Sequence, residues 1–240
     1  MRLFKFINES NFNEYYEKIK KECSLYLKNN KGNILYSGRD FNDIIVKSKV
    51  RKDRRPLSTS RKTHNNLDKI FNDIFGVRLR SESVFCTLNY RVANSYGRPY
   101  VIFPIGEYTF YWSTVLNDLY TKIKDFYTIT NLLVDDDYSL FILYYISNKE
   151  DYIKNKSDEK IIDILKTNHG YEEEDAINLL KELKKKIDTD YNFVKKEIKS
   201  LYVSDKMLDE TLDDEEIMLV CDEYYAIDAD NEELIKRLNK

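Results

Sequence analysis

The chain has 240 residues, which is enough for one large domain or two small ones with a hydrophobic core. No stretch approaches the roughly 18 consecutive apolar residues of a transmembrane helix. Three cysteines without paired spacing and only two histidines argue against a disulfide framework and against a metal centre. The first residues lack the long apolar run of a secretory signal, so we expect an intracellular protein in a reducing cytoplasm.

The net charge of −3 conceals an asymmetry between the two halves of the chain. Residues 1–120 carry 21 Lys and Arg against 12 Asp and Glu, a net charge of +9. Residues 121–240 carry 18 against 30, a net charge of −12. We therefore expect the first half to hold an anionic ligand and the second half to stay solvated.

Helical spacing of apolar residues predicts an amphipathic helix over 10–29, and a short strand at 33–36 runs into Ser37-Gly38-Arg39. Residues 47–62 then carry eight cations against Asp53, which we expect to brace one of the arginines. This basic stretch has three interpretations: arginine forks that bind a pyrophosphate, a surface for nucleic acid or another acidic partner, or a solvated loop. We favour the ligand role.

The rest of the first half alternates between helices and strands. A helix is predicted over 63–76, a strand over 83–87 and a short turn or helix over 89–97. The continuous apolar run 100–106 is typical of a buried strand, and residues 110–113 precede a further predicted helix.

The second half begins with a charged helical segment over 131–205, in which two helices are predicted to join near His169-Gly170. Strand signals return at 216–221 and at 224–227, with a turn predicted at Asp222-Glu223 between them. The last ten residues are expected to form a short charged helix.

Four short pieces occur in order at predicted strand edges: Leu35-Tyr36-Ser37-Gly38, Ser83-Val84-Phe85-Cys86-Thr87, Ala93-Asn94-Ser95-Tyr96-Gly97 and Glu215-Glu216-Ile217-Met218-Leu219. In this order they resemble the ADP-ribosyltransferase fold, and in particular uncharacterised bacteriophage proteins of that type. The resemblance covers 33–127 and 212–228. It implies one α+β domain over 1–240, a split β-sandwich that grips NAD in a central cleft, with 1–30 as an N-terminal helix and 131–205 as the helical insertion.

The resemblance also implies roles for individual residues. Glu216 matches the family's catalytic Glu, whose carboxylate stabilises the cationic sugar that forms when the nicotinamide–ribose bond breaks. Thr87 would orient the ribose or position Glu216, and Tyr96 would stack on the nicotinamide ring. Glu223 is the fallback for Glu216. The other residues expected to bind NAD are Tyr36, Ser37, Gly38, Arg39, Arg54, Arg55 and Phe85.

Each of these assignments competes with a plainer interpretation. Glu216 could equally be an exposed Glu at the start of a strand. Thr87 could be present for its strand propensity, and Tyr96 could be a tyrosine that packs in the core. The family generally places Arg or His before the glycine of its first strand, where this chain has Ser37. Either Arg39 binds the phosphates, or a cation from 51–55 does, or NAD binding is lost.

Three functions follow. The first is a phage-encoded mono-ADP-ribosyltransferase that modifies a host protein or nucleic acid in the host bacterial cytoplasm. The second is a catalytically silent relative that acts as a virion component or binds a host partner, which Ser37 favours. The third is a nucleic-acid-binding protein that works through residues 47–62, which the acidic overall charge and the lack of aromatic residues around that stretch disfavour. We expect no metal and no membrane association.

Overall fold

The computed structural model describes residues 9–30, 32–54, 61–113, 157–208, 212 and 215–239. The chain divides into two compact units, which we treat separately. One unit combines Met1–Leu119 with Lys199–Lys240, and the other is Tyr120–Ile198. Within the described ranges, no helix combines the length and apolar character needed to cross a membrane.

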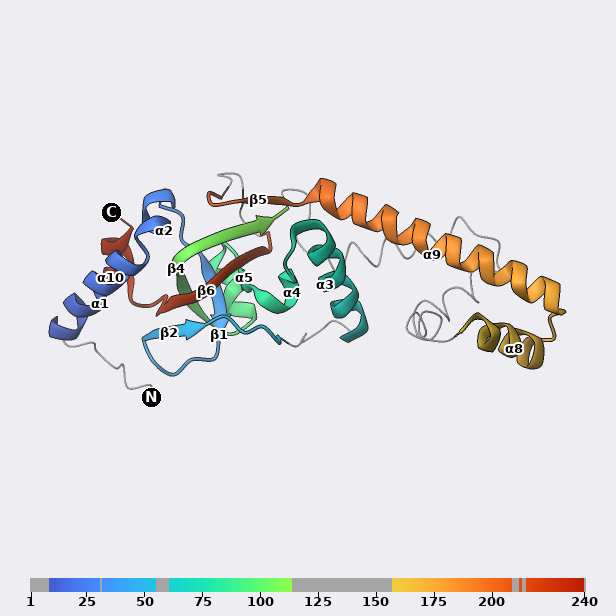
Figure 1. Ribbon diagram of the computed structural model, residues 1–240. Coiled ribbons are helices and arrows are strands. Elements are labelled where there is room, and N and C mark those ends of the chain that lie inside the picture. The colour runs from blue at the N-terminus through green and yellow to red at the C-terminus, as the bar shows by residue number, and fades with distance from the viewer. Residues whose placement is uncertain are drawn as a thin grey trace. The chain divides into compact units, whose positions relative to one another are not determined.

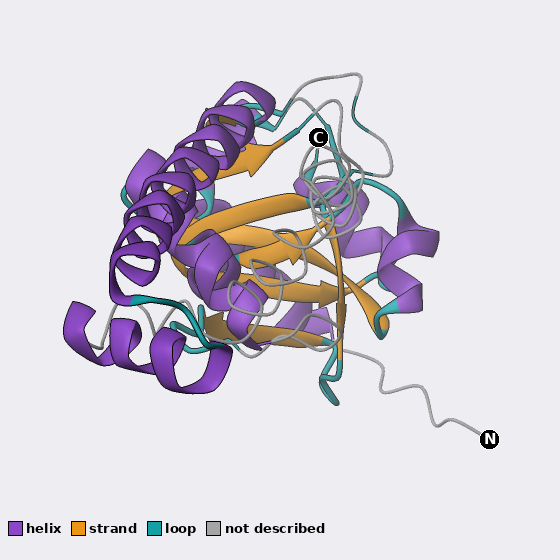
Figure 2. Ribbon diagram, turned by 90° about the vertical axis from the view of Figure 1, so that its right-hand side faces the viewer, coloured by secondary structure: helices purple, strands orange, loops and turns teal. Residues whose placement is uncertain are grey.

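The first unit is an α+β structure built on an antiparallel sheet (Figures 1 and 2). Its main path runs β1-β4-β6-β2, while β3 pairs with β6 and β5 pairs with β4. The α+β class predicted from the sequence is confirmed. The strands are β1 Tyr36–Arg39, β2 Ile45–Lys49, β3 Val84–Cys86, β4 Arg98–Trp112, β5 Val203–Asp205 and β6 Ile217–Asp228.

Helices α1 (Glu9–Glu22), α2 (Ser24–Asn29) and α10 (Glu232–Leu238) lie together beside the sheet (Figure 1). Helices α3 (Arg61–Phe75) and α4 (Leu79–Glu82) follow β2, and α5 (Tyr90–Ser95) packs on β1 and β4. The single helix predicted over 10–29 is interrupted at Cys23. The thiol of Cys23 donates a hydrogen bond to the carbonyl of Phe103 in β4 (3.6 Å) and so ties this junction to the sheet.

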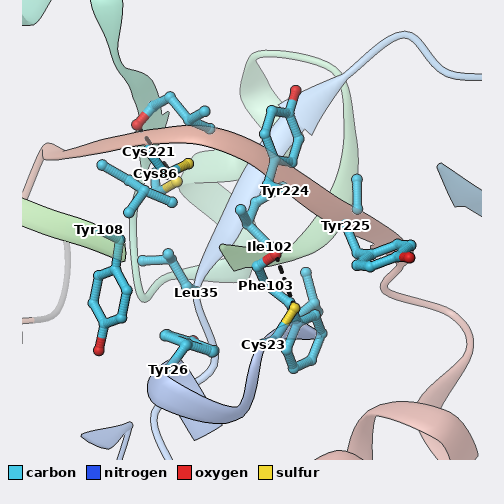
Figure 3. Packing of buried hydrophobic residues seen from close by; sticks show 14 of the residues in the cluster. Cys23, Tyr26, Leu35, Cys86, Ile102, Phe103, Tyr108, Cys221, Tyr224 and Tyr225 are labelled. Carbon is cyan, nitrogen blue, oxygen red and sulfur yellow. Dashed lines mark hydrogen bonds between the residues drawn. The ribbon is translucent and has the colours of Figure 1, made fainter. Parts of the chain in front are cut away.

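The hydrophobic core lies between α2 and one face of the sheet. Tyr26 from α2 is fully buried, and its ring meets the edges or faces of Phe103, Tyr108 and Phe110 at centroid distances of 5.8, 5.8 and 6.4 Å. Figure 3 shows Cys23 and Tyr26 on one side of the β6 ribbon and the Tyr224 ring on the other. The sheet therefore has two distinct faces, and α2 covers one of them.

The long strand β6 corrects the prediction for the end of the chain. A turn was predicted at Asp222-Glu223, but the backbone stays extended through both residues. Glu223 pairs with Lys49 of β2 on one side and Ile105 of β4 on the other. The irregularity lies in β4, where the register shifts between Ile105 and Tyr108 and Gly106 takes a φ of 68°. Because β4 absorbs the extra residue, β6 continues without a break.

Other boundaries also differ from the prediction. β1 begins at Tyr36 and not at residue 33, and β2, which was not predicted, runs into the start of the basic stretch. β4 extends to Trp112, well beyond the predicted 100–106. The helix predicted over 63–76 is confirmed as α3.

In the second unit, α8 (Asp158–His169) and α9 (Glu173–Leu201, which ends in the first unit) meet at Gly170 in the left-handed conformation (φ 70°). This confirms the predicted helix junction. Gly170 is suited to this position because a Cβ is disfavoured at positive φ. Side chains that face each other across the junction are buried in a small apolar cluster of Ile161, Leu165, Ala176 and Leu180.

Candidate functional site

In strand β1, the side chains of Ser37 and Arg39 lie on one face of the sheet, and Gly38 packs against α5. The hydroxyl of Ser37 donates a hydrogen bond to the carbonyl of Phe85 in β3 (2.6 Å), which ties the two strands together. A Cβ on Gly38 would lie 2.4 Å from the carbonyl oxygen of Ala93, so this glycine lets α5 approach the strand. Its expected role, close approach of NAD, stays a prediction.

The register of the sheet explains why Phe85 and Glu216 lie close together. Phe85 stands opposite Met218, and opposite residues of an antiparallel pair share a face. Glu216 lies two residues before Met218, so its side chain emerges on that same face. The neighbouring pair Cys86 and Ile217 points the other way into the core.

Three arginines converge on this face around the Phe85 ring and Glu216. The guanidinium of Arg54 lies 3.7 Å from the centroid of the Phe85 ring, and that of Arg80 lies 5.3 Å from it. Nη1 of Arg80 is 3.7 Å from Oε1 of Glu216. Arg39 lies 5.8 Å from the centroid of the Tyr224 ring on β6. We call Arg39, Arg54 and Arg80 the arginine cluster.

The arginine cluster places an excess of positive charge in a partly buried setting. The pKa of Arg54 is lowered to about 10, mainly by burial; the positive charges of Arg39 and Arg80 also lower it, and Glu216 opposes them. Among the described residues, the charges that act on Arg54 thus include two guanidinium groups and one carboxylate. The Nε atoms of Arg39 and Arg80 are buried without a hydrogen-bond partner among the described residues. This combination of desolvation, like charge and unused donors is typical of a site that binds an anion.

Arg80 was missed in the sequence, although its guanidinium lies 3.7 Å from the Glu216 carboxylate. It lies in α4, a helix of four residues that is too short to give an apolar period. The signal available was a basic residue next to the predicted strand 83–87. Its side chain is 11% exposed, which is unusual for an arginine without a bidentate carboxylate partner.

The structure separates other predicted site residues from the arginine cluster. The ring of Tyr36 meets that of Tyr90 edge to face (5.7 Å), and both line a cavity of about 350 Å³ beside α10. Because side chains alternate along a strand, Tyr36 points away from the face that carries Ser37 and Arg39. Tyr96 ends α5 with 73% of its surface exposed, and it makes no ring contact or hydrogen bond with the arginine cluster among the described residues.

Thr87 is placed beside the site by its backbone. It exchanges two backbone hydrogen bonds with Tyr36 (2.8 and 2.9 Å), and its hydroxyl accepts one from the backbone N–H of Asn89 (3.2 Å). The β3–β6 register, continued by one residue, sets Thr87 opposite Glu216. Its proposed action on Glu216 stays a prediction.

The basic stretch after β2 divides into separate parts. Arg51 pairs with Asp53 (3.3 Å) and is exposed, which confirms that Asp53 braces an arginine, whereas Arg54 turns into the site. Arg55 lies outside the described residues. The fallback Glu223 pairs with Lys47 (3.5 Å) at the β2 edge of the sheet.

The described residues contain no group of three or more His, Cys, Asp or Glu side chains that could hold a metal ion. The arrangement can instead bind an anion with two or more charges and hold a carboxylate beside it. Comparisons with protein-family models, curated proteins and solved structures find no match to this chain, so the interpretation of the site rests on its geometry.

Proposed function

We propose that this protein is a mono-ADP-ribosyltransferase with a split β-sandwich fold, encoded by a phage, that transfers ADP-ribose from NAD to a host protein or nucleic acid. One observation carries the proposal: Glu216 lies beside the buried Arg80 and the half-buried Arg54 on the face that also presents Phe85, with the half-buried Arg39 near them. NAD offers a doubly charged pyrophosphate for the arginines and a ribose for the carboxylate. The fold and the resemblance of the four sequence pieces support the same choice.

The site residues fit the two needs of this reaction. In the transfer, the bond between nicotinamide and the ribose breaks, the acceptor forms a bond to the same ribose carbon and loses a proton, and nicotinamide leaves. The arginine cluster would hold the pyrophosphate through guanidinium donors such as the Nε atoms of Arg39 and Arg80. Arg39 thereby takes the phosphate-binding role that Ser37 cannot fill, since the hydroxyl of Ser37 is bonded to Phe85.

Glu216 would bind the ribose hydroxyl and stabilise positive charge on the sugar. Such a preorganised carboxylate is typically a large catalytic contribution because its charge is already in place when positive charge develops on the sugar. Arg80 lies near Glu216 in the present arrangement, and a pyrophosphate bound by Arg80 would compete for the same guanidinium. The ribose hydroxyl would then take the place of Arg80 beside the Glu216 carboxylate when the substrate is bound.

A second function is favoured by the same ion pair. If Arg80 holds Glu216 permanently, the site binds an anion without transferring anything. The protein would then be a catalytically inactive relative that serves as a virion component or binds a host partner. The two functions share the anion site and differ in the fate of Glu216.

The deciding experiment measures NAD binding by calorimetry and transfer of labelled ADP-ribose to a host lysate. Glu216→Gln is compared with Glu215→Gln, whose side chain is on the neighbouring position and points to the other face. We expect the Glu216→Gln variant to bind NAD and to lose transfer by a factor of about 100 or more, with Glu215→Gln close to the unchanged protein. Binding without transfer in the unchanged protein supports the inactive relative. Absence of both NAD binding and transfer at millimolar NAD contradicts the transferase and leaves the inactive relative, with a host partner as its ligand.

A further inference from the structure

A buried hydrogen-bonded group connects α3 to α4 directly behind the arginine cluster. One carboxylate oxygen of Asp68 accepts hydrogen bonds from the backbone N–H groups of Arg80 (2.8 Å) and Ser81 (3.1 Å). The other accepts a short hydrogen bond from the hydroxyl of Ser81. Nε2 of His64 lies 3.0 Å from that hydroxyl oxygen and 3.5 Å from Asp68. The side chains of His64, Asp68 and Ser81 are all buried.

These contacts fix which nitrogen of His64 carries hydrogen in the neutral ring. The hydroxyl of Ser81 donates its one hydrogen to Asp68, so it has only lone pairs to offer His64. Nε2 must therefore be the donor, and Nδ1 keeps the lone pair. Nδ1 is buried without a hydrogen-bond partner among the described residues. It is the atom that would accept a proton.

The serine, histidine and aspartate do not form a hydrolytic triad. In such a triad the histidine lies between the other two residues, whereas here Ser81 contacts both His64 and Asp68. All three are also buried away from any substrate. The carboxylate of Asp68 instead binds the backbone N–H groups of Arg80 and Ser81. The three residues therefore fix the position of Arg80.

The charges that act on His64 come from three elements. They are Asp68 on α3, Arg80 on α4 and Arg54 on the segment after β2. Burial lowers the pKa of His64; the carboxylate of Asp68 opposes this, the two arginines add to it, and the backbone carbonyl of Arg54 also opposes it. An anion that neutralised the arginines would remove a force that keeps His64 neutral.

We propose that Asp68 and His64 are positioning residues that hold Arg80 and Arg54 for the phosphates of the ligand, and that anion binding draws a proton onto His64. The proposal rests on the anion site of the proposed function, but it does not require transfer of ADP-ribose. Asp68 holds the backbone of Arg80 through the hydrogen bond from its N–H (2.8 Å), and Nδ1 of His64 is the atom that would take the proton. By linkage, protonation of His64 tightens anion binding by the same factor as the anion favours protonation.

The test is a pH titration of His64 in the full chain by ¹H–¹³C NMR, with sulfate as the anion. Sulfate stays doubly charged over the whole range, so only the protein titrates. The chain has just two histidines, His64 and His169, and His169→Gln assigns the signals. Sodium chloride at equal ionic strength is the reference. We expect saturating sulfate to raise the midpoint by about half a pKa unit, which corresponds to roughly threefold tighter binding to the protonated form.

Variants identify which residue couples sulfate binding to the midpoint of His64. Arg80→Gln should raise the midpoint without sulfate and remove most of the sulfate-dependent rise, while Arg51→Gln, an exposed arginine, should change neither. Asp68→Asn should weaken sulfate binding about tenfold if it folds, since the backbone of Arg80 loses a charged acceptor. The titration of His64 in the unchanged protein tests the proposal even without the Asp68→Asn variant.

An equal midpoint in sulfate and chloride overturns the proposal, as does a sulfate-dependent rise that persists in Arg80→Gln. The result of this test can be distinguished from the result of the transfer assay. A sulfate-dependent midpoint without NAD binding leaves this inference standing and removes NAD as the ligand. Transfer of ADP-ribose with an unchanged midpoint removes the inference alone.

Discussion

The guanidinium of Arg54 lies 3.7 Å from the centroid of the Phe85 ring, close enough for the cation to rest on the aromatic face. This contact stabilises the arginine, whereas burial and the neighbouring arginines destabilise its charge and lower its pKa to about 10. The protein thus holds a cation where the folded state gains little from it. Such a balance is expected where a residue is kept for ligand binding.

Replacing Arg54 should therefore separate stability from binding. We expect Arg54→Met to change the free energy of unfolding by less than about 1 kcal/mol, because loss of the cation–π contact and relief of buried charge offset each other. Anion affinity should fall about tenfold or more. Urea denaturation and sulfate-dependent thermal shifts measure the two quantities, with Arg51→Met as the exposed control. A loss of stability well above 2 kcal/mol would make Arg54 a structural residue.

Gly38 tests how α5 is seated on β1. A Cβ there would approach the carbonyl oxygen of Ala93 to 2.4 Å and the backbone nitrogen of Gly97 to 2.9 Å, and backbone atoms cannot move aside cheaply. We expect Gly38→Ala to lower the free energy of unfolding by about 2 to 3 kcal/mol. Gly76→Asn is the control, because nothing lies within 4 Å of a Cβ there and Asn tolerates positive φ. Equal losses in the two variants would contradict the packing role.

Part of the site could be predicted because apolar runs in the sequence indicate strands. Glu216 was found at the edge of such a run, Arg39 is the last residue of β1, and Arg54 lies on the segment that follows β2. What brings them together is strand pairing between segments more than a hundred residues apart, such as Phe85 with Met218. Local sequence pattern carries no information on that register, so the convergence could not be predicted.

The wrong predictions have local causes. Asp222-Glu223 has the composition of a turn, but Glu223 binds Lys47 and Lys49 across the β2 edge, and this offsets the poor strand propensity of the acidic residues. Strand β2 was hidden in the basic stretch because its lysines face solvent at a sheet edge, where charge is common. Arg80 gave no signal because α4 is held by Asp68 and not by apolar periodicity.

The three cysteines should be unreactive in the folded protein. Burial raises the pKa of Cys221 to about 12 and raises the pKa values of Cys23 and Cys86 above the usual thiol range. Only a very small thiolate fraction exists near pH 8, and the thiols are also covered. We expect a thiol-specific chromogenic reagent to label none of them quickly in buffer and all three in concentrated urea. Rapid labelling of one thiol in buffer would show that its part of the core opens readily.

Tyr26 should dominate the contribution of α2 to stability. Its ring is fully buried against three aromatic rings of β4, so Tyr26→Ala leaves a cavity that the rigid strand cannot close. We expect a loss of about 3 to 5 kcal/mol in the free energy of unfolding. Tyr15, on the exposed side of α1, is the matched control and should cost under about 0.5 kcal/mol. Chemical denaturation monitored by circular dichroism distinguishes the two, and a small effect at Tyr26 would place the N-terminal helices outside the cooperative core.

Glu22 links α1 to the sheet in a way that depends on pH. Its carboxylate accepts hydrogen bonds from Lys47 (2.8 Å) and from the hydroxyl of Tyr225 (3.1 Å). The bond from Lys47 lowers the pKa of Glu22 most; burial opposes it, and Tyr225 adds to the lowering. A lowered pKa in the folded state means that the stabilisation is present above the unfolded pKa and is lost as pH falls through the folded value.

We therefore expect Glu22→Gln to lower the free energy of unfolding by about 1 kcal/mol at neutral pH, the upper range for a partly exposed pair. The difference from the unchanged protein should shrink as pH falls below the unfolded pKa of Glu and through the lowered folded value, where Glu22 becomes protonated. Glu14→Gln, which breaks an exposed pair within α1, should cost under about 0.5 kcal/mol. Urea denaturation at neutral and at acidic pH measures this, and a penalty for Glu22→Gln that stays constant with pH would attribute it to packing and not to charge.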